Sequence, residues 1–226
     1  MPAPLSQAVE DYLKTIYRLA ERERPVTTTR LAQELAVAPA SVTNMLKRLA
    51  RLRLVRHTPY HGVELTEAGQ KVALEVIRHH RLLELYLSRY LGVRLDRVHG
   101  EADRLEHALS EDLEDRIAEA LGEPAVDPHG HPIPTREGAV APAGGVVLAD
   151  ARAGQRGTVT RVNDRDADTV RELAAAGLVP GAPVEVVAAG RRGVEIRVEG
   201  HPRRIGPALA GEVYLALEGD RPAQDA

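Results

Sequence analysis

Apolar side chains recur at helical spacing through the first fifty residues. From Ser6 to Glu21 they follow a period of three to four positions, which predicts an amphipathic helix. Residues 27–35 begin with threonines that can cap a short helix, and Pro39 suits the first turn of a further helix that ends near Leu52. The pattern therefore predicts three consecutive helices.

Two short β-like runs follow the third predicted helix. They cover Leu54–Arg56 and Val63–Leu65, and Tyr60–Gly62 between them suits the tip of a hairpin. Three helices followed by a hairpin is the element order of a winged helix-turn-helix, in which the last of the three helices enters the major groove of DNA.

Longer apolar repeats predict two further helices. One runs from Thr66 to Tyr90 and stops at Gly92, and the other spans about Glu101–Leu121, with Leu or Ile at every fourth position. Two long helices of this kind suit a dimer interface. Residues Gly122–Gly145 are rich in proline, glycine and alanine, and Ala139–Gly145 is the part that predicts a flexible linker.

Beyond the linker, short apolar or alternating runs lie between glycines. Such runs predict the strands of a small β-barrel, interrupted by a short helix at Thr169–Ala176. The runs are Gly157–Val162, Pro183–Val187, Val194–Val198 and Glu212–Leu217. The expected fold class is mainly α with a small β part.

The composition narrows the chemistry that the chain can perform. It has no cysteine, which excludes disulfides, thiolate zinc sites and cysteine nucleophiles. Any metal ion must be held by His, Asp, Glu, carbonyl groups or water. No apolar stretch approaches the roughly 18–20 residues that span a bilayer, and the first residues lack the features of a secretory signal. We therefore expect a soluble cytoplasmic protein.

The charge is unevenly distributed along the chain. Lys plus Arg and Asp plus Glu number 11 and 7 in residues 1–73, 8 and 14 in residues 74–140, and 11 and 12 in residues 141–226. A basic first segment and an acidic second one agree with a nucleic-acid module followed by a metal-holding module.

The third predicted helix carries the residues expected to contact DNA. Short polar side chains near the start of such a helix reach base edges, whereas basic ones hold phosphates. A solvated face is the more common reading of a lone basic helix, but the hairpin that follows favours DNA binding. The base-reading candidates are Ser41, Thr43 and Asn44, and the phosphate-binding candidates are Lys47, Arg48, Arg51 and the wing residue His61.

Two groups of His, Asp and Glu have the spacing of metal ligands. Asp103, Glu106 and His107 stand at i, i+3 and i+4, so a helix would project them from one face. His80 and Glu84 are four apart on the preceding helix, with His99 just before the next. Imidazole and carboxylate ligands without sulfur favour Mn²⁺ or Fe²⁺ over Cu⁺, and they do not exclude Zn²⁺. A solvated acidic face is the more common reading of either group alone.

The motifs together resemble the diphtheria toxin repressor family of iron- and manganese-dependent regulators. They extend over nearly the whole chain in the family's order. The matching segments are Asp11–Tyr17, Pro39–Met45, Leu65–Gly69, His80–Glu84, Val98–Asp103, Glu106–His107 and Gly130–Pro134. The resemblance implies a winged-helix DNA-binding domain (1–73), a helical dimerisation and metal-binding domain (74–140), a flexible linker (141–152), an SH3-like β-barrel (153–220) and a disordered tail (221–226).

The resemblance also implies two metal sites. The principal site corresponds to Asp11, Asp103, Glu106 and His107. The second corresponds to His80, Glu84 and His99, with Asp166 near the position where long members add a ligand from the barrel, and Glu172 nearby.

Three positions distinguish this chain within the family that it resembles. Asp11 and Asp103 stand where iron-type members have methionine and cysteine, as in manganese-type members. Lys14 stands where some manganese-type members carry a second acidic residue, and the site that His80 serves is left open.

The resemblance implies a homodimeric repressor of metal-uptake genes that binds double-stranded operator DNA when Mn²⁺ or Fe²⁺ binds. One cation shared by Asp11 and the later ligands would tie the first helix to the dimerisation helix. No enzymatic activity, membrane partner or small organic substrate is expected. The alternatives are a metallohydrolase that uses the same His, Asp and Glu clusters, and a DNA-binding regulator with an organic effector.

Overall fold

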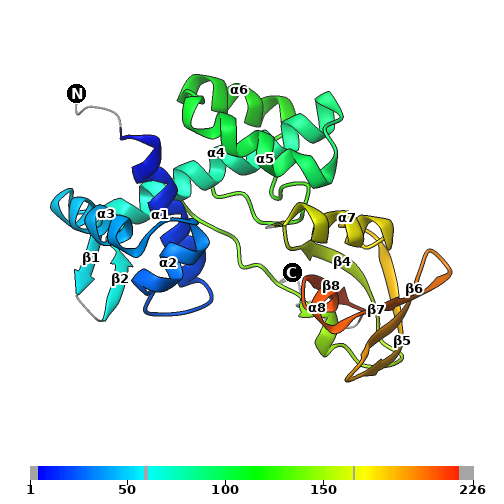
Figure 1. The fold of residues 1–226 in the computed structure, drawn as a ribbon. Coiled ribbons are helices and arrows are strands. Elements are labelled where there is room, and N and C mark those ends of the chain that lie inside the picture. Colours follow the sequence, from blue (N-terminus) through cyan, green and yellow to red (C-terminus); the bar gives the residue numbers. More distant parts are fainter. Residues whose placement is uncertain (1–4, 59–60, 165, 219–226) are drawn as a thin grey trace, which may run out of the picture. The chain divides into compact units, whose positions relative to one another are not determined.

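The computed structural model describes residues 5–58, 61–164 and 166–218 (Figure 1). The chain forms two compact units. One contains the residues up to His80 together with Leu105–Ser110 and Pro134–Val140. The other contains Arg81–Arg104, Glu111–Ile133 and the chain from Ala141 onward. Each unit is built from segments that lie far apart in the sequence.

Three helices and a two-stranded wing begin the first unit, as the hydrophobic pattern predicts. Thr27 caps the second helix, because its hydroxyl accepts a hydrogen bond from the backbone N–H of Arg30. The hydrophobic core of this part combines all three helices with the wing, through residues such as Leu13, Leu46 and Val63. The elements are α1 (Gln7–Ala20), α2 (Thr28–Glu34), α3 (Pro39–Arg51), β1 (Val55–Thr58) and β2 (Gly62–Leu65).

The wing strands pair antiparallel, with Val55 opposite Leu65. The predicted hairpin tip at Tyr60 lies outside the described residues, as does the predicted tail after residue 220. After the wing, α4 (Glu67–Leu91) extends for 25 residues and confirms the predicted long helix. The Thr66 hydroxyl caps its start by accepting from the N–H of Gly69.

The prediction of one continuous helix over Glu101–Leu121 is wrong. The structure has α5 (Leu95–Leu105), a 3₁₀ turn η1 (Glu106–Ala108) and α6 (Glu111–Leu121). The chain leaves helical geometry after η1, since Leu109 adopts an extended conformation. The four-residue repeat was misleading because Leu105 and Leu113 are 43% and 48% exposed rather than buried on one common face.

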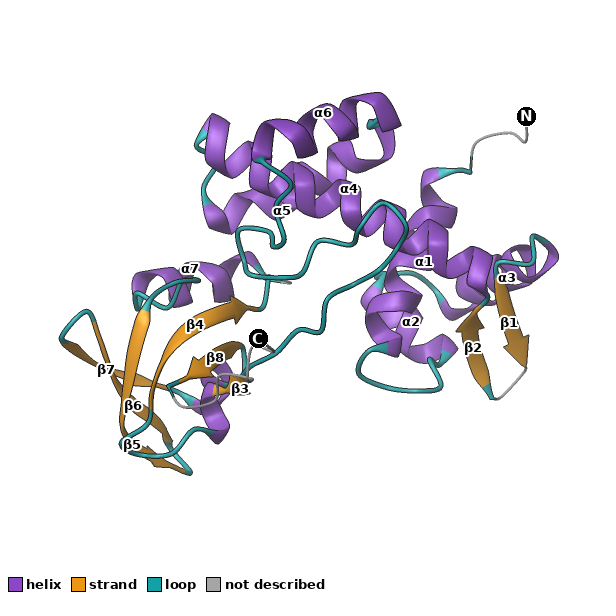
Figure 2. Cartoon of the chain, turned by 180° about the vertical axis from the view of Figure 1, so that it is seen from behind, coloured by secondary structure: helices purple, strands orange, loops and turns teal. Residues whose placement is uncertain are grey.

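The C-terminal part of the second unit is an antiparallel sheet with its own core, and it includes the four predicted strands (Figure 2). The strand order is β3-β8-β4-β5-β6-β7. β3 and β7 were missed, because the first has two residues and the second contains proline and two arginines. The strands are β3 (Val146–Val147), β4 (Arg156–Val162), β5 (Pro183–Gly190), β6 (Gly193–Val198), β7 (His201–Ile205) and β8 (Val213–Leu217).

Three short helical segments complete this sheet domain. They are η2 (Leu148–Asp150), α7 (Ala167–Ala175) and α8 (Pro207–Ala210). Leu173 of α7 is buried in the same core as the strands, so the helix covers one end of the sheet (Figure 2). The predicted helix and the predicted mainly α fold with a small β part are confirmed. None of the described helices combines the length and the apolar content that a membrane span requires.

An irregular segment around Gly130 packs against β4. The N–H of Val162 donates to the carbonyl of His129, and a bridge pairs Val126 with Pro132. Gly130 has a φ of +90°, and a Cβ atom there would lie 1.9 Å from the carbonyl oxygen of Thr160. Only glycine permits this approach, which fixes the position of the neighbouring Asp127 and His129.

Candidate metal centre and nucleic-acid interface

The first cluster lies in the first unit, where α1 meets the 3₁₀ turn η1. Asp11 from α1 and Glu106 and His107 from η1 offer ligand atoms that all lie within 4.8 Å of one another. The His107 ring lies between two carboxylates, with Nε2 2.9 Å from Asp11 Oδ1 and Nδ1 2.6 Å from Glu10 Oε2. We call Asp11, Glu106, His107 and the adjacent Lys14 and His80 the principal cluster.

Glu106 is the most buried carboxylate of the principal cluster and has the closest partners. The Lys14 ammonium donates to its Oε1 at 2.7 Å and its Oε2 at 2.8 Å, and His80 Nδ1 donates to Oε2 at 2.6 Å. Burial alone would raise the pKa of Glu106, but the His80 hydrogen bond and the Lys14 charge outweigh it and lower that pKa. Glu106 is therefore held in its ionised form by the lysine and the histidine beside it.

Asp11 is in a different electrostatic situation at the edge of the same cluster. Burial raises its pKa, and the nearby Glu106 adds to the rise, while His107 opposes it. Carboxylates that raise one another's pKa are stabilised by a shared cation, and a divalent ion between Asp11 and Glu106 would remove this repulsion.

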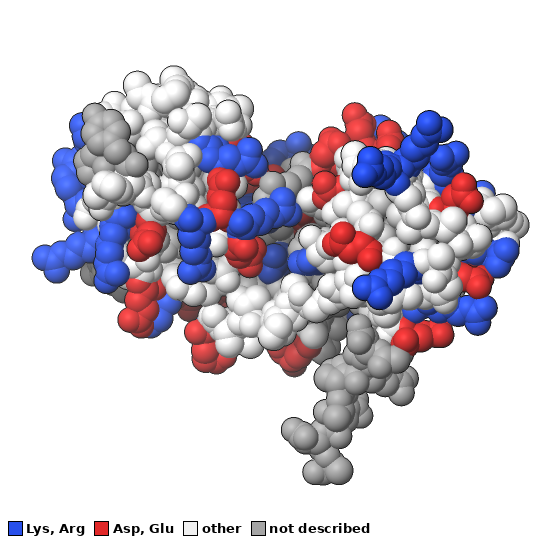
Figure 3. All heavy atoms as spheres, turned by 90° about the horizontal axis from the view of Figure 1, so that it is seen from below, with Lys and Arg blue, Asp and Glu red and all other residues white. Residues whose placement is uncertain are grey.

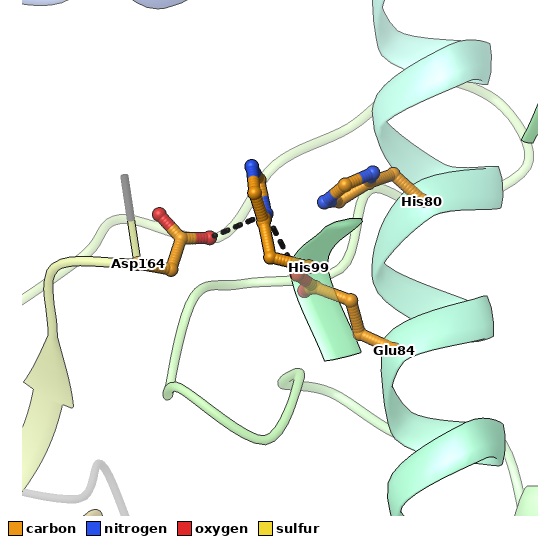
Figure 4. Close-up of side chains that lie close together, drawn as sticks. All are labelled: His80, Glu84, His99 and Asp164. Atoms are coloured by element: carbon orange, nitrogen blue, oxygen red, sulfur yellow. Dashed lines mark hydrogen bonds and ion pairs between the residues drawn. The ribbon is translucent and has the colours of Figure 1, made fainter. Parts of the chain in front are cut away.

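The second cluster lies entirely in the second unit and joins the helical part to the sheet. Glu84 from α4, Asp127 and His129 from the segment before Gly130, and Asp164 after β4 offer ligand atoms within 4.8 Å of one another. His99 of α5 lies between two of these carboxylates, as Figure 4 shows, with Nδ1 2.9 Å from Glu84 Oε1 and 3.7 Å from Asp164 Oδ2.

Several ligand atoms of the second cluster are buried without a hydrogen-bond partner among the described residues. They include Asp127 Oδ2 and His129 Nδ1, and Nδ1 of the neighbouring His131 is in the same situation. Orphaned buried polar atoms are costly, and a bound cation is one explanation for them. Burial alone would lower the pKa of His129, but the carboxylates of Glu84, Asp164 and Asp127 raise it to about 9. The donor set of oxygen and imidazole nitrogen suits Mn²⁺, Fe²⁺ or Zn²⁺.

The structure places Asp166 elsewhere than in the second cluster, contrary to expectation. Its side chain caps α7 by accepting hydrogen bonds from the N–H groups of Asp168 and Thr169. The first N–H groups of a helix have no acceptor within the helix, so an aspartate just before it commonly binds them. Asp164, two residues earlier, is the acidic group that joins the cluster. Glu172 is exposed on α7.

Asp103 and His80 are found on helices, as the sequence predicts, whereas His99, expected just before a helix, lies within α5. Asp103 is on α5, where its Oδ2 lies 3.6 Å from Nε2 of His99. His80 lies against Glu106 and is one turn before Glu84 on α4 (Figure 4). Its role in the second site stays a prediction.

Sequence reasoning missed Glu10, Lys14 as a partner of Glu106, Asp127, His129, His131 and Asp164. Asp127, His129 and His131 alternate at i, i+2 and i+4, a spacing that places ligands on one side of an extended segment. This alternation is the feature of the sequence that could have indicated these ligands. The segment lies outside the predicted strands and helices, so the hydrophobic pattern does not point to it.

The recognition helix α3 presents most of its predicted DNA contacts to solvent. Ser41, Asn44, Lys47, Arg48 and Arg51 are exposed, whereas the apolar face of the helix is buried. Figure 3 shows basic side chains along the left edge of the view, over the winged-helix part, with acidic side chains among them.

Two of the predicted DNA-binding residues, Thr43 and His61, differ in how accessible their side chains are. Thr43 is half-buried, and its hydroxyl donates to the carbonyl of Pro39 within the same helix, which reduces its capacity to read a base. His61 at the wing is exposed.

Comparison with protein families matches three successive parts of the chain. Residues 4–63 match the N-terminal DNA binding domain of iron dependent repressors, and residues 66–135 match their metal binding and dimerisation domain. Residues 146–217 match the FeoA domain.

Individual proteins match over most of their length. An iron-dependent repressor of Mycobacterium tuberculosis is 36% identical over 87% of this chain and 91% of its own length. The diphtheria toxin repressor of Corynebacterium glutamicum is 31% identical over 81% of this chain and 85% of its own. The solved structure of a manganese-dependent transcriptional repressor in complex with manganese has a TM-score of 0.84 and 35% identity, covering 92% of this chain and 98% of that one.

Proposed function

Because the chain belongs to the iron-dependent repressor family, a family of DNA-binding transcriptional repressors with a winged-helix domain, a dimerisation domain and an SH3-like domain, we propose that it is activated for operator binding by Mn²⁺ or Fe²⁺. It would bind double-stranded DNA as a homodimer in the cytoplasm and repress metal-uptake genes. This family contains repressors rather than hydrolases, so the metallohydrolase alternative is wrong.

One observation carries the proposal: Asp11 on the first helix of the winged-helix domain lies within 4.8 Å of the ligand atoms of Glu106 and His107. Asp11 is 95 positions before Glu106 and 96 before His107 in the sequence, yet the three side chains converge. Asp11, Glu106 and His107 would hold the regulatory ion, and Asp103, three residues before Glu106, stays a predicted further ligand.

The second cluster is proposed as a supporting metal site. Glu84, Asp127, His129 and Asp164 would hold its ion, with His99 adjacent to both Glu84 and Asp164. The orphaned buried atoms of Asp127 and His129 support this assignment. Asp164 belongs to the sheet domain and Glu84 to α4, so an ion here would fix the sheet domain to the helices within the second unit.

The switch follows from the positions of the ligands in the chain. A bound dication supplies positive charge between carboxylates that otherwise repel one another. Asp11 would then be held to Glu106 and His107, which fixes α1 and with it the orientation of α3. Two recognition helices must be about 34 Å apart to meet successive major grooves, so a small change in their spacing controls binding. The ion shifts this equilibrium only by its preference for the binding-competent form.

The test is a mobility-shift assay with the DNA upstream of the protein's own gene, run anaerobically with Mn²⁺, Fe²⁺ and Zn²⁺ in turn. We expect retention of intact DNA with Mn²⁺ or Fe²⁺ and none with chelator. Asp11→Asn and Glu106→Gln should each abolish the metal-dependent shift. Glu67→Gln, at an exposed carboxylate on α4 outside both clusters, is the matched control. Unchanged DNA affinity in both cluster variants would refute the switch.

A further inference from the structure

Lys14 is a buried lysine within the acidic environment of the principal cluster. Only 6% of it is exposed, and lysine is rarely buried to this extent unless its charge is paired. Its ammonium donates to both oxygens of Glu106, whose own exposure is 1%, and it lies 3.3 Å from His80 Nδ1. The carboxylate therefore already has a cation on each of its oxygens.

Lys14 and a divalent ion would need the same carboxylate. Glu106 Oε1, which accepts from Lys14, also lies 3.3 Å from His107 Nε2, and Asp11 is one helical turn before Lys14 on α1. An ion held by Asp11, Glu106 and His107 would have to take an oxygen of Glu106 that Lys14 now holds. Two cations close to one carboxylate repel each other strongly in a buried site, because the effective dielectric there is low.

We infer that Lys14 is a resident cation that competes with the divalent ion for Glu106 and thereby sets the metal concentration at which the principal cluster fills. This inference rests on the proposed function of that cluster. Without metal, the ammonium neutralises Glu106 and keeps it ordered. With metal, the ammonium shares Glu106 or gives up part of it, which weakens ion binding and raises the concentration needed to activate the protein.

The competing explanation is that Lys14 and Glu106 form a purely structural ion pair. The two explanations predict opposite changes in metal affinity when Lys14 is removed. If Lys14 only stabilises the fold, its removal loosens Glu106 and weakens metal binding. If it competes with the ion, its removal strengthens metal binding while the metal-free protein becomes less stable, because Glu106 loses its counter-ion.

The experiment measures Mn²⁺ binding by calorimetry in an Asp127→Asn background, in which the second cluster is impaired. Lys14→Met removes the charge at nearly constant length, and Lys14→Arg keeps it. We expect Lys14→Met to lower the Kd for Mn²⁺ at least tenfold and Lys14→Arg to leave it within about threefold. Lys71→Met is the matched control, since Lys71 is an exposed lysine that faces Glu67 on α4, and it should change nothing.

Thermal unfolding provides a second measurement on the same proteins. The melting temperature of metal-free Lys14→Met should fall below that of the parent, and saturating Mn²⁺ should raise it by more than it raises the parent's. A folded Lys14→Met protein that binds Mn²⁺ no more tightly than the parent overturns the inference. A parent that binds no Mn²⁺ at the principal cluster overturns the proposed function as well, so the two failures are distinguishable.

A third measurement needs no substitution at Lys14. The ¹⁵N resonance of its ammonium can be followed while the otherwise unmodified protein is titrated with Cd²⁺, a diamagnetic probe. A shift that saturates with filling of the principal cluster supports competition for Glu106. A resonance that stays unchanged as that cluster fills overturns it, even if the Lys14 variants fail to fold.

Discussion

Lys14 in the principal cluster and Arg81 beside the second cluster contact the acidic ligands differently. Lys14 donates to both oxygens of Glu106, whereas Arg81 directs a guanidinium N–H to the carbonyl of Pro132 and leaves its Nε 3.7 Å from Asp127 Oδ2. The principal cluster therefore satisfies its most buried carboxylate from within the protein. The second cluster keeps buried ligand atoms of Asp127 and His129 that have no hydrogen-bond partner among the described residues.

This difference indicates that similar ligands serve different purposes in the two clusters. A cluster with an internal counter-ion can exist without metal and respond when metal arrives. A cluster whose buried atoms lack hydrogen-bond partners is stabilised more by a permanently bound ion. Such an ion would support the structure. The following changes test this contrast, from the largest expected effect to the smallest.

Removing one partner of the buried pair in the principal cluster should have the largest effect. Glu106→Leu leaves the Lys14 ammonium buried without its carboxylate, and we expect the metal-free protein to lose about 3–5 kcal/mol of unfolding free energy. The double variant Lys14→Met with Glu106→Leu should recover most of that loss. Urea denaturation measures both values, with the exposed Glu67→Leu as control. A single variant as stable as the parent would contradict the internal counter-ion.

Substituting one ligand of the second cluster should remove an ion but keep the fold. Asp127 Oδ1 accepts from the N–H groups of His129 and His131, an arrangement that asparagine can preserve. Asp127→Asn changes only the atom that faces the cluster, so we expect Mn²⁺ affinity there to fall about a hundredfold. Calorimetry should show one fewer high-affinity ion per chain. An unchanged stoichiometry would show that Asp127 is not a ligand.

Displacing the segment that carries Asp127 should have a smaller effect on the second cluster. Gly130→Ala places a Cβ against the Thr160 carbonyl at a positive φ, and we expect a loss of about 2 kcal/mol in stability. Mn²⁺ affinity at the second cluster should fall while that of the principal cluster stays constant. Gly190→Ala, at a position with open space, is the control. Equal stability of the two variants would be inconsistent with the close approach to β4.

The pH dependence of Mn²⁺ binding should also differ between the two clusters, and this is the smallest of the expected effects. With a folded pKa of about 9, His129 carries a proton at neutral pH that an ion must displace. Mn²⁺ affinity at the second cluster should therefore rise up to about tenfold per pH unit between pH 7 and 9. In the metal-free protein, the stabilisation from this raised pKa is complete below about pH 6.5 and disappears as the pH rises through 9. His129→Gln should flatten the affinity profile, and a slope that survives this change would assign the proton to another group.

The sequence predicts elements well where one periodicity decides the structure. The amphipathic spacing of α1, α3 and α4, together with the caps of α2 at Thr27 and of α4 at Thr66, recovers these four helices closely. The break at η1 was not predictable in this way, because the leucine repeat continues through it while Glu106 and His107 pair with residues of α1. The domain borders proposed from the sequence stay predictions.

The sites were predicted only in part, for a related reason. The spacing of Glu106 and His107 indicated a ligand pair, but nothing local links them to Asp11, whose inclusion came from family resemblance. Asp164 and Asp166 are both acidic and close in the sequence, and only the fold decides that one caps α7 and the other joins the second cluster. Tertiary contacts, rather than residue type, make that choice.

The two ends of the described sheet have a consequence for how copies of the protein associate. β3 is only two residues long, and β7 carries Pro202, Arg203 and Arg204 along its exposed length. Short edges, proline and positive charge all oppose the addition of a strand from another molecule. The sheet domain is thereby protected from edge-to-edge aggregation, which agrees with the match of residues 66–135, rather than the sheet, to a dimerisation domain.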